Sequence, residues 1–250
     1  RDIQRVTQAA KDQRVLTSIL LVHQALVEPR LSIDQVGSLS AGLVEFILGR
    51  INTISGLQLD GDDLERFPRR DGVTKVAARD LPVAAAQGRD GATTVAGSLA
   101  ACAAAGLDVF ATGGIGGVHR EPSYDESADL AELARTSVVV VCAGAKSILD
   151  LPATLERLDS YGVTLLGYRT DEFPGFFTAS TGLSVPARVD SAAEIADILR
   201  HARRLGRPGA VLVVQPPPAD AALDRETVDR AVEQALVLAR TAGVRGGAVT

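Results

Sequence analysis

The residue with the clearest capacity for chemistry in this sequence is Lys146, which follows four consecutive valines and four small residues. β-branched side chains suit a strand buried on both faces, and the small residues suit a turn from that strand into a helix. A lysine at the carboxyl end of a buried parallel strand reaches the crevice where open α/β sheets bind ligands. Apolar surroundings there disfavour the charged amine and make it a nucleophile that forms a Schiff base with a carbonyl. A surface lysine in the first helical turn is the alternative, and this segment alone does not separate the two.

A glycine cluster, Gly113–Gly117, follows a second predicted strand. Its backbone can approach a ligand closely, as phosphate-binding loops do, and Gly114 is the candidate contact within it. His119 and Arg120 come directly afterwards and are candidate anion ligands. The cluster matches neither the G-x-G-x-x-G dinucleotide-binding turn nor a P-loop. An exposed flexible turn with polar residues is therefore the alternative interpretation.

Two predicted helix starts and one short strand add polar residues to this set. Thr93 and Thr94 stand where free N–H groups and hydroxyls together suit a phosphate. Ser127 and Asp129 begin another helix, where a serine cap and an acidic first turn are the simpler interpretation. If Asp129 faces the crevice instead, it can hold a divalent cation that keeps several waters. Lys75, on an apolar strand, is a further cation for the same anion or a proton carrier.

The elements that must position these residues alternate between short apolar strands and helices from residue 73 onward. This alternation predicts βαβ units and a parallel sheet with helices on both faces. Right-handed crossovers bring the strand ends after Lys75, Thr112, Ala143 and Tyr168 to one edge, so the candidate residues converge there. The predicted strands are Val73–Val76, Leu107–Thr112, the valine run, Val163–Tyr168 and Ala210–Val214. The predicted helices are Gly91–Gly106, Ser127–Ala134, Leu151–Ser160, Ser191–Leu205 and Arg225–Ala242.

The first seventy residues follow a less regular pattern. Helices are predicted at Ile3–Gln13 and Asp60–Phe67, and a strand at Leu43–Leu48. We interpret residues 1–250 as a single α/β domain with a divergent first part, because 250 residues suffice for one large core. We also expect both ends to be trimmed, since the chain starts at Arg1 and stops without a closing element.

Composition excludes several classes of protein. The net charge is only −5 and no basic patch or aromatic stripe stands out, which argues against a nucleic-acid polymer as partner. No apolar run reaches the length of a membrane span, and no signal-peptide pattern is present. Cys102 and Cys142 lie in apolar runs and are interpreted as reduced core residues. These features together predict a cytoplasmic protein.

Several of these motifs resemble the pseudouridine-5′-phosphate glycosidase family closely. The resemblance covers roughly Val73 to Thr250 and implies a three-layer α/β/α sandwich around a mainly parallel sheet. It also implies a homotrimer, and an enzyme that joins or splits the carbon–carbon bond between ribose 5-phosphate and uracil. The stretches that carry the resemblance are Gly91–Val95, Val109–Arg120, Ser127–Leu130, Val141–Leu151, Arg188–Ser191 and Glu194–Ala196.

The resemblance implies a role for each candidate residue. Lys146 matches the lysine that forms a Schiff base with C1 of the ring-opened sugar, and Lys75 is a second catalytic candidate. Asp129 matches the aspartate linked to a divalent cation, for which Mn²⁺ is the expected ion and Mg²⁺ or Ca²⁺ the alternatives. The motifs that line the phosphate and sugar site contain Lys75, Thr93, Thr94, Gly114, His119 and Ser127.

One departure from the family concerns the choice of acceptor. The family carries an N-terminal glutamate used in acid–base steps, and Thr17 stands at the matching position in Leu16-Thr17-Ser18-Ile19. Threonine cannot exchange protons near neutral pH as a carboxylate does. We therefore predict a C-glycosynthase that joins C1 of ribose 5-phosphate to an aromatic, polyketide-type acceptor in natural-product biosynthesis. The alternatives are a pseudouridine-5′-phosphate glycosidase acting with uracil, and a non-catalytic sugar-phosphate-binding relative, against which Lys146 argues.

Overall fold

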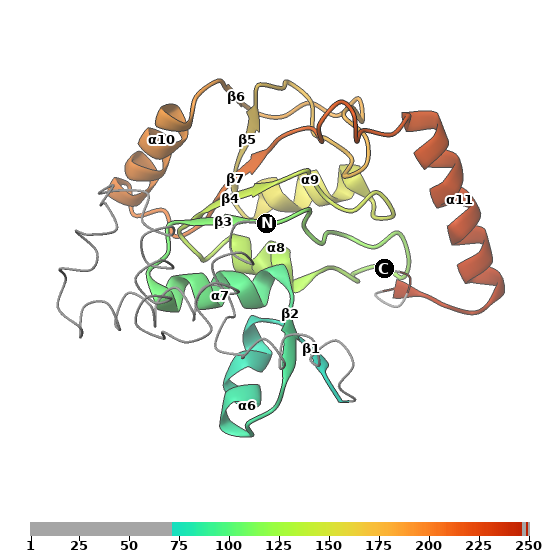
Figure 1. Cartoon of the computed structure of the whole chain (residues 1–250), viewed down its shortest axis with the longest axis horizontal. Coiled ribbons are helices and arrows are strands. Elements are labelled where there is room, and N and C mark those ends of the chain that lie inside the picture. Colours follow the sequence, from blue (N-terminus) through green and yellow to red (C-terminus); the bar gives the residue numbers. More distant parts are fainter. Residues whose placement is uncertain (1–71, 247–248, 250) are drawn as a thin grey trace, which may run out of the picture. The chain divides into compact units, whose positions relative to one another are not determined.

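The computed structural model describes residues 72–246 and 249, and Gly72–Thr250 form one compact unit (Figure 1). The elements predicted before residue 71, and Thr17 with them, lie outside the described residues. A single domain over residues 1–250 therefore stays a prediction.

The described unit is built on a parallel sheet of five strands in the order β3-β4-β7-β5-β6. Its central strands β4, β5 and β7 are made of the apolar runs singled out in the sequence, because such runs can be buried on both faces. The strands are β3 (Val109–Ala111), β4 (Val139–Cys142), β5 (Thr164–Tyr168), β6 (Arg188–Val189) and β7 (Val211–Val214).

Helices cover both faces of this sheet, which confirms the predicted α/β/α layers. Val140 and Cys142 of β4 pack with the cluster that contains residues of α7, α8 and α9, whereas Val139 packs with Leu199 of α10 on the opposite face. The forward steps from β3 to β4 and from β4 to β5 run through α8 and α9. The connection from β6 to β7 crosses the sheet in the opposite direction and contains α10. Because crossovers are right-handed, α10 lies on the other face of the sheet. These helices are α7 (Val95–Ala105), α8 (Ala128–Leu133), α9 (Leu151–Ser160) and α10 (Ala192–Arg204).

The segment predicted to open the first of these helices is a strand instead. Gly91–Thr93 forms β2, which pairs in parallel with β1 (Thr74–Val76) in a separate two-stranded sheet. A side chain at Gly91 would collide with Val76, so glycine permits the close pairing. The helix begins only after Thr94, whose hydroxyl accepts a hydrogen bond from the Gly97 N–H. The prediction that the end of β1, with Lys75, lies at the edge of the main sheet is therefore wrong.

The remaining elements complete the unit. The last helix, α11 (Arg225–Thr241), matches its prediction to within one residue and lies at the opposite end of the unit from α10 (Figure 1). Two short helices, η2 (Ala78–Asp80) and α6 (Leu81–Ala86), were not predicted. Among the described residues, no helix combines the length and the apolar character that crossing a bilayer requires.

Candidate functional site

The loops that follow β3 and β4 meet at the carboxyl edge of the main sheet, as the sequence predicts. The Ala143 N–H donates to the Gly113 carbonyl over 3.0 Å, and the Ile115 N–H donates to the Gly144 carbonyl over 3.0 Å. The Lys146 N–H donates in turn to the Ile115 carbonyl over 3.2 Å. The backbone of Lys146 is therefore fixed directly beside the glycine cluster.

The surroundings of the Lys146 side chain differ from those predicted. The side chain is exposed, and no described residue forms a hydrogen bond or an ion pair with its amine. Because α9 begins only at Leu151, Lys146 lies on the loop after β4, neither in apolar surroundings nor in the first helical turn. An amine without a partner on this edge is free to meet a carbonyl from solution.

Asp129 is the residue that joins the helix starts to the glycine cluster. It is buried, and one carboxylate oxygen accepts the Ala96 N–H at 2.8 Å while the other accepts the Gly116 N–H at 2.9 Å. The Asp129 N–H donates to Oγ of Ser127 at 3.2 Å, so Ser127 caps α8 as the simpler interpretation holds. The carboxylate therefore binds the first turn of α7 and the glycine cluster together.

Two positions of the cluster require glycine, because neighbouring atoms leave no room for a Cβ. A Cβ at Gly116 would collide with Ser127 and lie 2.9 Å from a carboxylate oxygen of Asp129. A Cβ at Gly114 would lie 2.7 Å from Cε2 of Phe176, and a Gly144 oxygen would be 3.0 Å away. The cluster is thus packed on both sides and is not the exposed flexible turn that was the alternative.

The start of α7 offers fewer free donors than the sequence suggests. The Gly97 N–H is bound by the Thr94 hydroxyl at 3.2 Å, and the Ala96 N–H is bound by Asp129. Thr93 lies on exposed β2, with its hydroxyl 3.1 Å from that of Ser98. A phosphate at this place would be bound by the hydroxyls more than by the helix N–H groups, and this role of Thr93 and Thr94 stays a prediction.

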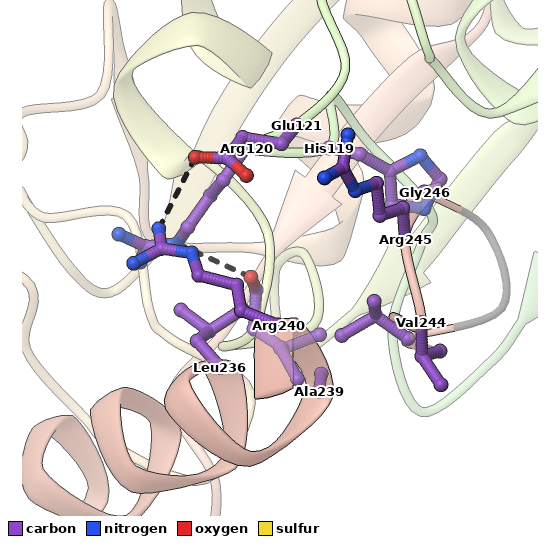
Figure 2. Close-up of a pocket in the computed structure, with 11 residues that line it drawn as sticks. His119, Arg120, Glu121, Leu236, Ala239, Arg240, Val244, Arg245 and Gly246 are labelled. Carbon is purple, nitrogen blue, oxygen red and sulfur yellow. Dashed lines mark hydrogen bonds and ion pairs between the residues drawn. The ribbon is translucent and has the colours of Figure 1, made fainter. Parts of the chain in front are cut away.

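His119 and Arg120 lie in a pocket that the C-terminal part of the chain closes (Figure 2). His119 is largely buried, and its Nδ1 lies 3.2 Å from a carboxylate oxygen of Asp125. Arg120 donates through Nε to the carbonyl of Ile148, two residues beyond Lys146, at 3.2 Å. Arg240 of α11 pairs with Glu121 at 3.3 Å across the same pocket. The further lining residues are Leu236, Ala239, Val244, Arg245, Gly246 and Val249.

Lys75 is not linked to this group by any contact among the described residues. It lies exposed on β1 in the two-stranded sheet, and no described residue pairs with its amine. Its predicted catalytic role stays a prediction.

The described residues do not form a complete cation site around Asp129. Both of its oxygens already accept backbone N–H groups, and no group of three or more His, Cys, Asp or Glu side chains in residues 72–246 and 249 is arranged to hold a metal ion. A divalent cation needs several oxygen ligands, which waters or other residues would have to supply. The metal role of Asp129 and the preference for Mn²⁺ stay predictions.

The sequence reasoning missed the loop that follows β5. The Phe176 N–H donates to the Ala143 carbonyl at 2.9 Å, and the Ser147 hydroxyl donates to the Gly175 carbonyl at 2.5 Å. This loop is therefore bound to the Lys146 segment. The signal was the run Phe173-Pro174-Gly175-Phe176-Phe177, in which aromatic residues surround a turn at the end of a predicted strand.

A parallel sheet covered by helices on both faces defines an α/β protein. Open sheets of this class bind ligands at the carboxyl edge, where Lys146 and the glycine cluster lie. The chain belongs to the indigoidine synthase A like protein family, whose model matches residues 38–250. This membership, with the relatives below, confirms the resemblance stated from the motifs.

Two similar proteins carry the same name. A protein of Gemmatimonas aurantiaca named pseudouridine-5′-phosphate glycosidase is 63% identical over 194 residues, which are 78% of this chain and 63% of that protein. A protein of Chloroflexus aurantiacus with the same name is 50% identical over 217 residues, or 84% of this chain and 71% of that protein. The chain thus spans less than two thirds of the length of the Gemmatimonas relative.

Two solved structures are similar. The crystal structure of the prealnumycin C-glycosynthase AlnA in complex with ribulose 5-phosphate has a TM-score of 0.71 and 39% identity, and the match covers 76% of this chain and 64% of that one. An indigoidine synthase A (IdgA)-like protein from Thermotoga maritima has a TM-score of 0.66 and 28% identity, over 87% of this chain and 74% of that one.

Proposed function

We propose that the protein catalyses the reversible cleavage of pseudouridine 5′-phosphate to ribose 5-phosphate and uracil. The observation that carries this proposal is the position of Lys146, whose backbone is bound to the glycine cluster at the carboxyl edge of the sheet and whose amine has no described partner. A relative that only binds sugar phosphates would form no covalent bond at this amine, which distinguishes that alternative experimentally.

The relatives support uracil as the acceptor over the aromatic polyketide predicted first. The proteins named pseudouridine-5′-phosphate glycosidase reach 63% and 50% identity, whereas AlnA reaches 39%. The earlier preference depended on Thr17, which lies outside the described residues. An aromatic C-glycosynthase remains the second candidate, because the AlnA structure shares this fold with a TM-score of 0.71.

The proposed reaction needs an amine that condenses with an aldehyde. In the direction of synthesis, the Lys146 amine attacks C1 of ring-opened ribose 5-phosphate and one water leaves as the imine forms. The protonated imine then accepts an electron pair from C5 of uracil, and C5 gives up its proton after the carbon–carbon bond has formed. The sugar's C4 hydroxyl then attacks C1 and displaces the lysine nitrogen, which takes the hydroxyl proton, so the ribose ring closes and the amine is restored. In cleavage these steps run backward: the amine displaces the ring oxygen from C1 and its proton passes to that oxygen, the C1–C5 bond breaks with its electron pair returning to C5, C5 takes a proton, and the imine remains on C1. Hydrolysis of the imine releases the sugar and restores the amine.

The polar residues around the lysine would hold the phosphate and the sugar. His119, Ser127, Thr93, Thr94 and Gly114 are proposed for this role, with Lys75 as a further cation. Charge-assisted hydrogen bonds of this kind contribute about 1.5–3 kcal/mol each, enough to orient the sugar.

Reductive trapping tests the proposal. Borohydride added with ribose 5-phosphate should attach the sugar covalently to Lys146, and mass spectrometry of the digested protein should locate it. Lys146→Ala should abolish both the adduct and the cleavage of pseudouridine 5′-phosphate. Lys75→Ala is the matched control for trapping and should still yield the Lys146 adduct. An adduct on Lys75, or full turnover by the Lys146→Ala variant, would refute the assignment.

The choice of acceptor is measured with the same protein. Formation of pseudouridine 5′-phosphate from ribose 5-phosphate and uracil should be much faster than any coupling to an aromatic polyketide. The reverse order of rates would establish the C-glycosynthase instead.

A further inference from the structure

The backbone of Phe176 adopts a conformation that is rare for a phenylalanine. Its φ is 65°, in the left-handed region that bulky side chains avoid because Cβ crowds the carbonyl. The hydrogen bond from its N–H to Ala143 holds it there. Tyr124 and Arg169 also have positive φ, at 67° and 56°, but Tyr124 is almost wholly exposed. Conformations of this kind concentrate at functional sites.

The strained backbone places the Phe176 ring on the glycine cluster. A Cβ added at Gly113 would lie 3.5 Å from Cε2 of the ring, and one added at Gly114 would overlap the ring. The ring is only partly covered, so part of it faces solvent. Phe177 meets it edge-on, with ring centroids 4.6 Å apart and an interplanar angle of 86°.

The same loop is joined to the segment that carries the proposed nucleophile. Gly175 forms a β-bridge with Gly144, and its carbonyl accepts the hydroxyl of Ser147, the residue after Lys146. Lys146 is itself bound through its N–H to Ile115 of the same stretch of backbone. Phe176 and Lys146 thus contact one stretch, Gly113–Ile115, from two different loops.

We propose that the Phe176 ring is the surface on which the planar acceptor base stacks, which makes Phe176 a specificity-determining residue. The inference rests on the proposed function, because it assigns the base-binding part of the same site. A flat, partly exposed aromatic ring on the glycine cluster, to which the Lys146 backbone is also bound, offers a π-face to a pyrimidine. Stacking of this kind contributes substantially to the binding of bases. The strained backbone at Phe176 then has a functional reason, because it places the ring where the base would stack.

Kinetics in the direction of synthesis test the proposal, because they separate the two substrates. In Phe176→Leu the KM for uracil should rise about 5- to 100-fold, the usual effect of losing one base–aromatic stack. The KM for ribose 5-phosphate should stay within about 2-fold, since the sugar binds at Lys146 and not on the ring. Phe177→Leu, the same change at the neighbouring residue, should leave both KM values near those of the unmodified protein. An unchanged KM for uracil in Phe176→Leu, or an equal rise in Phe177→Leu, would overturn the proposal.

A second measurement does not depend on the leucine variant folding. The chain contains no tryptophan, so Phe176→Trp introduces a single tryptophan, whose emission can be excited selectively over that of the three tyrosines. Uracil, added with ribose 5-phosphate, should quench its fluorescence in a saturable manner. Phe177→Trp is the matched control and should be quenched much less. Equal quenching of the two would refute stacking at Phe176.

The two proposals fail in different ways. If the unmodified protein forms no borohydride adduct and no pseudouridine 5′-phosphate, the proposed function is wrong. If it does both, but the Phe176 variants behave like the Phe177 variants, only the stacking surface is wrong.

Discussion

The Asp129 carboxylate shows how one buried polar side chain can join two segments of the backbone. Burial of an ionised group is expensive unless hydrogen bonds replace the lost water. Here the two oxygens receive the N–H groups of Ala96 and Gly116, from segments that are far apart in the sequence. The start of α7 and the glycine cluster are therefore held together by a charge-assisted pair of hydrogen bonds.

Replacement of Asp129 by asparagine should destabilise the protein. The amide offers one acceptor oxygen, so either Ala96 or Gly116 would face an NH₂ group and lose its partner. An unpaired buried donor costs about 1–3 kcal/mol, and we expect this decrease in the free energy of unfolding by urea titration. Asp159→Asn, at an exposed position of α9, is the control and should change stability by less than about 0.5 kcal/mol. Equal stabilities of the two variants would contradict the role given to Asp129.

Features of single residues that depend on near neighbours in the sequence were predicted, whereas those that depend on long-range contacts were not. Ser127 as a helix cap and the position of Lys146 after β4 follow from local sequence, because caps and strand ends depend on near neighbours. The exposure of Lys146 and the partners of Asp129 depend on how segments distant in the sequence pack together. The loop with Phe176 was missed because the contact between its ring and Gly114 is long-range.

At the scale of elements, Thr154 helps to bind α9 to the residues that follow the glycine cluster, next to the backbone hydrogen bond from the Asp150 N–H to the Val118 carbonyl. Thr154 is fully buried, and its hydroxyl donates to the Asp150 carbonyl at 2.7 Å and accepts the Val118 N–H at 3.0 Å. Gly117 lies so close that a Cβ there would collide with Thr154. The helix that follows β4 and the loop that follows β3 are therefore fixed to each other at this residue.

Thr154→Val should lower the free energy of unfolding, because valine has nearly the volume of threonine but lacks the hydroxyl that links these two elements. The methyl group that replaces the hydroxyl leaves the Val118 N–H without an acceptor, which costs about 1–3 kcal/mol. Thr154→Ser keeps the hydroxyl and loses one methyl group, worth about 0.8 kcal/mol, so it should be the milder change. Thermal unfolding of the three proteins gives the ranking. A valine variant as stable as the unmodified protein would contradict the role of the hydroxyl.

Helix and strand positions were largely predictable where the apolar pattern is strong. The boundaries of α9 match their prediction, and α10 and α11 differ by at most a residue at each end. Gly91–Thr93 was assigned to a helix because threonine and glycine are typical of helix starts. Its pairing with β1 overrides that preference, since strand formation depends on a partner.

At the scale of the whole described unit, the fold was predictable because the strands alternate with helices and the valine-rich strands are buried on both faces. The sequence does not reveal that β7 lies between β4 and β5. The order of strands depends on which connection crosses back over strands already placed, and local sequence does not determine this. Nor does it show that β1 and β2 form a sheet of their own. The sheet edge that carries Lys146 was nevertheless predicted, because parallel strands all end at one edge.

The two cysteines report on whether this unit unfolds as a whole. Burial raises the pKa of the Cys142 thiol to about 12, although a backbone hydrogen bond from Gly144 lowers it, and burial also raises the pKa of Cys102. At pH 8 very little reactive thiolate therefore exists in the folded protein, whereas an unfolded thiol has a pKa of about 8.5. Both residues pack in the same hydrophobic cluster, Cys102 from α7 and Cys142 from β4.

Iodoacetamide at pH 8 should therefore label the two cysteines at one common, slow rate that increases with urea. An unfolding event that exposes β4 should also expose α7, because residues of both elements pack in one hydrophobic cluster. Mass spectrometry of peptides from each cysteine measures both rates in one sample, and Cys102→Ser serves to show that labelling of Cys142 does not depend on the other thiol. Labelling of Cys102 many times faster than Cys142 in the absence of urea would show that α7 opens separately from the sheet. The start of α7 would then be an independent, mobile part of the site.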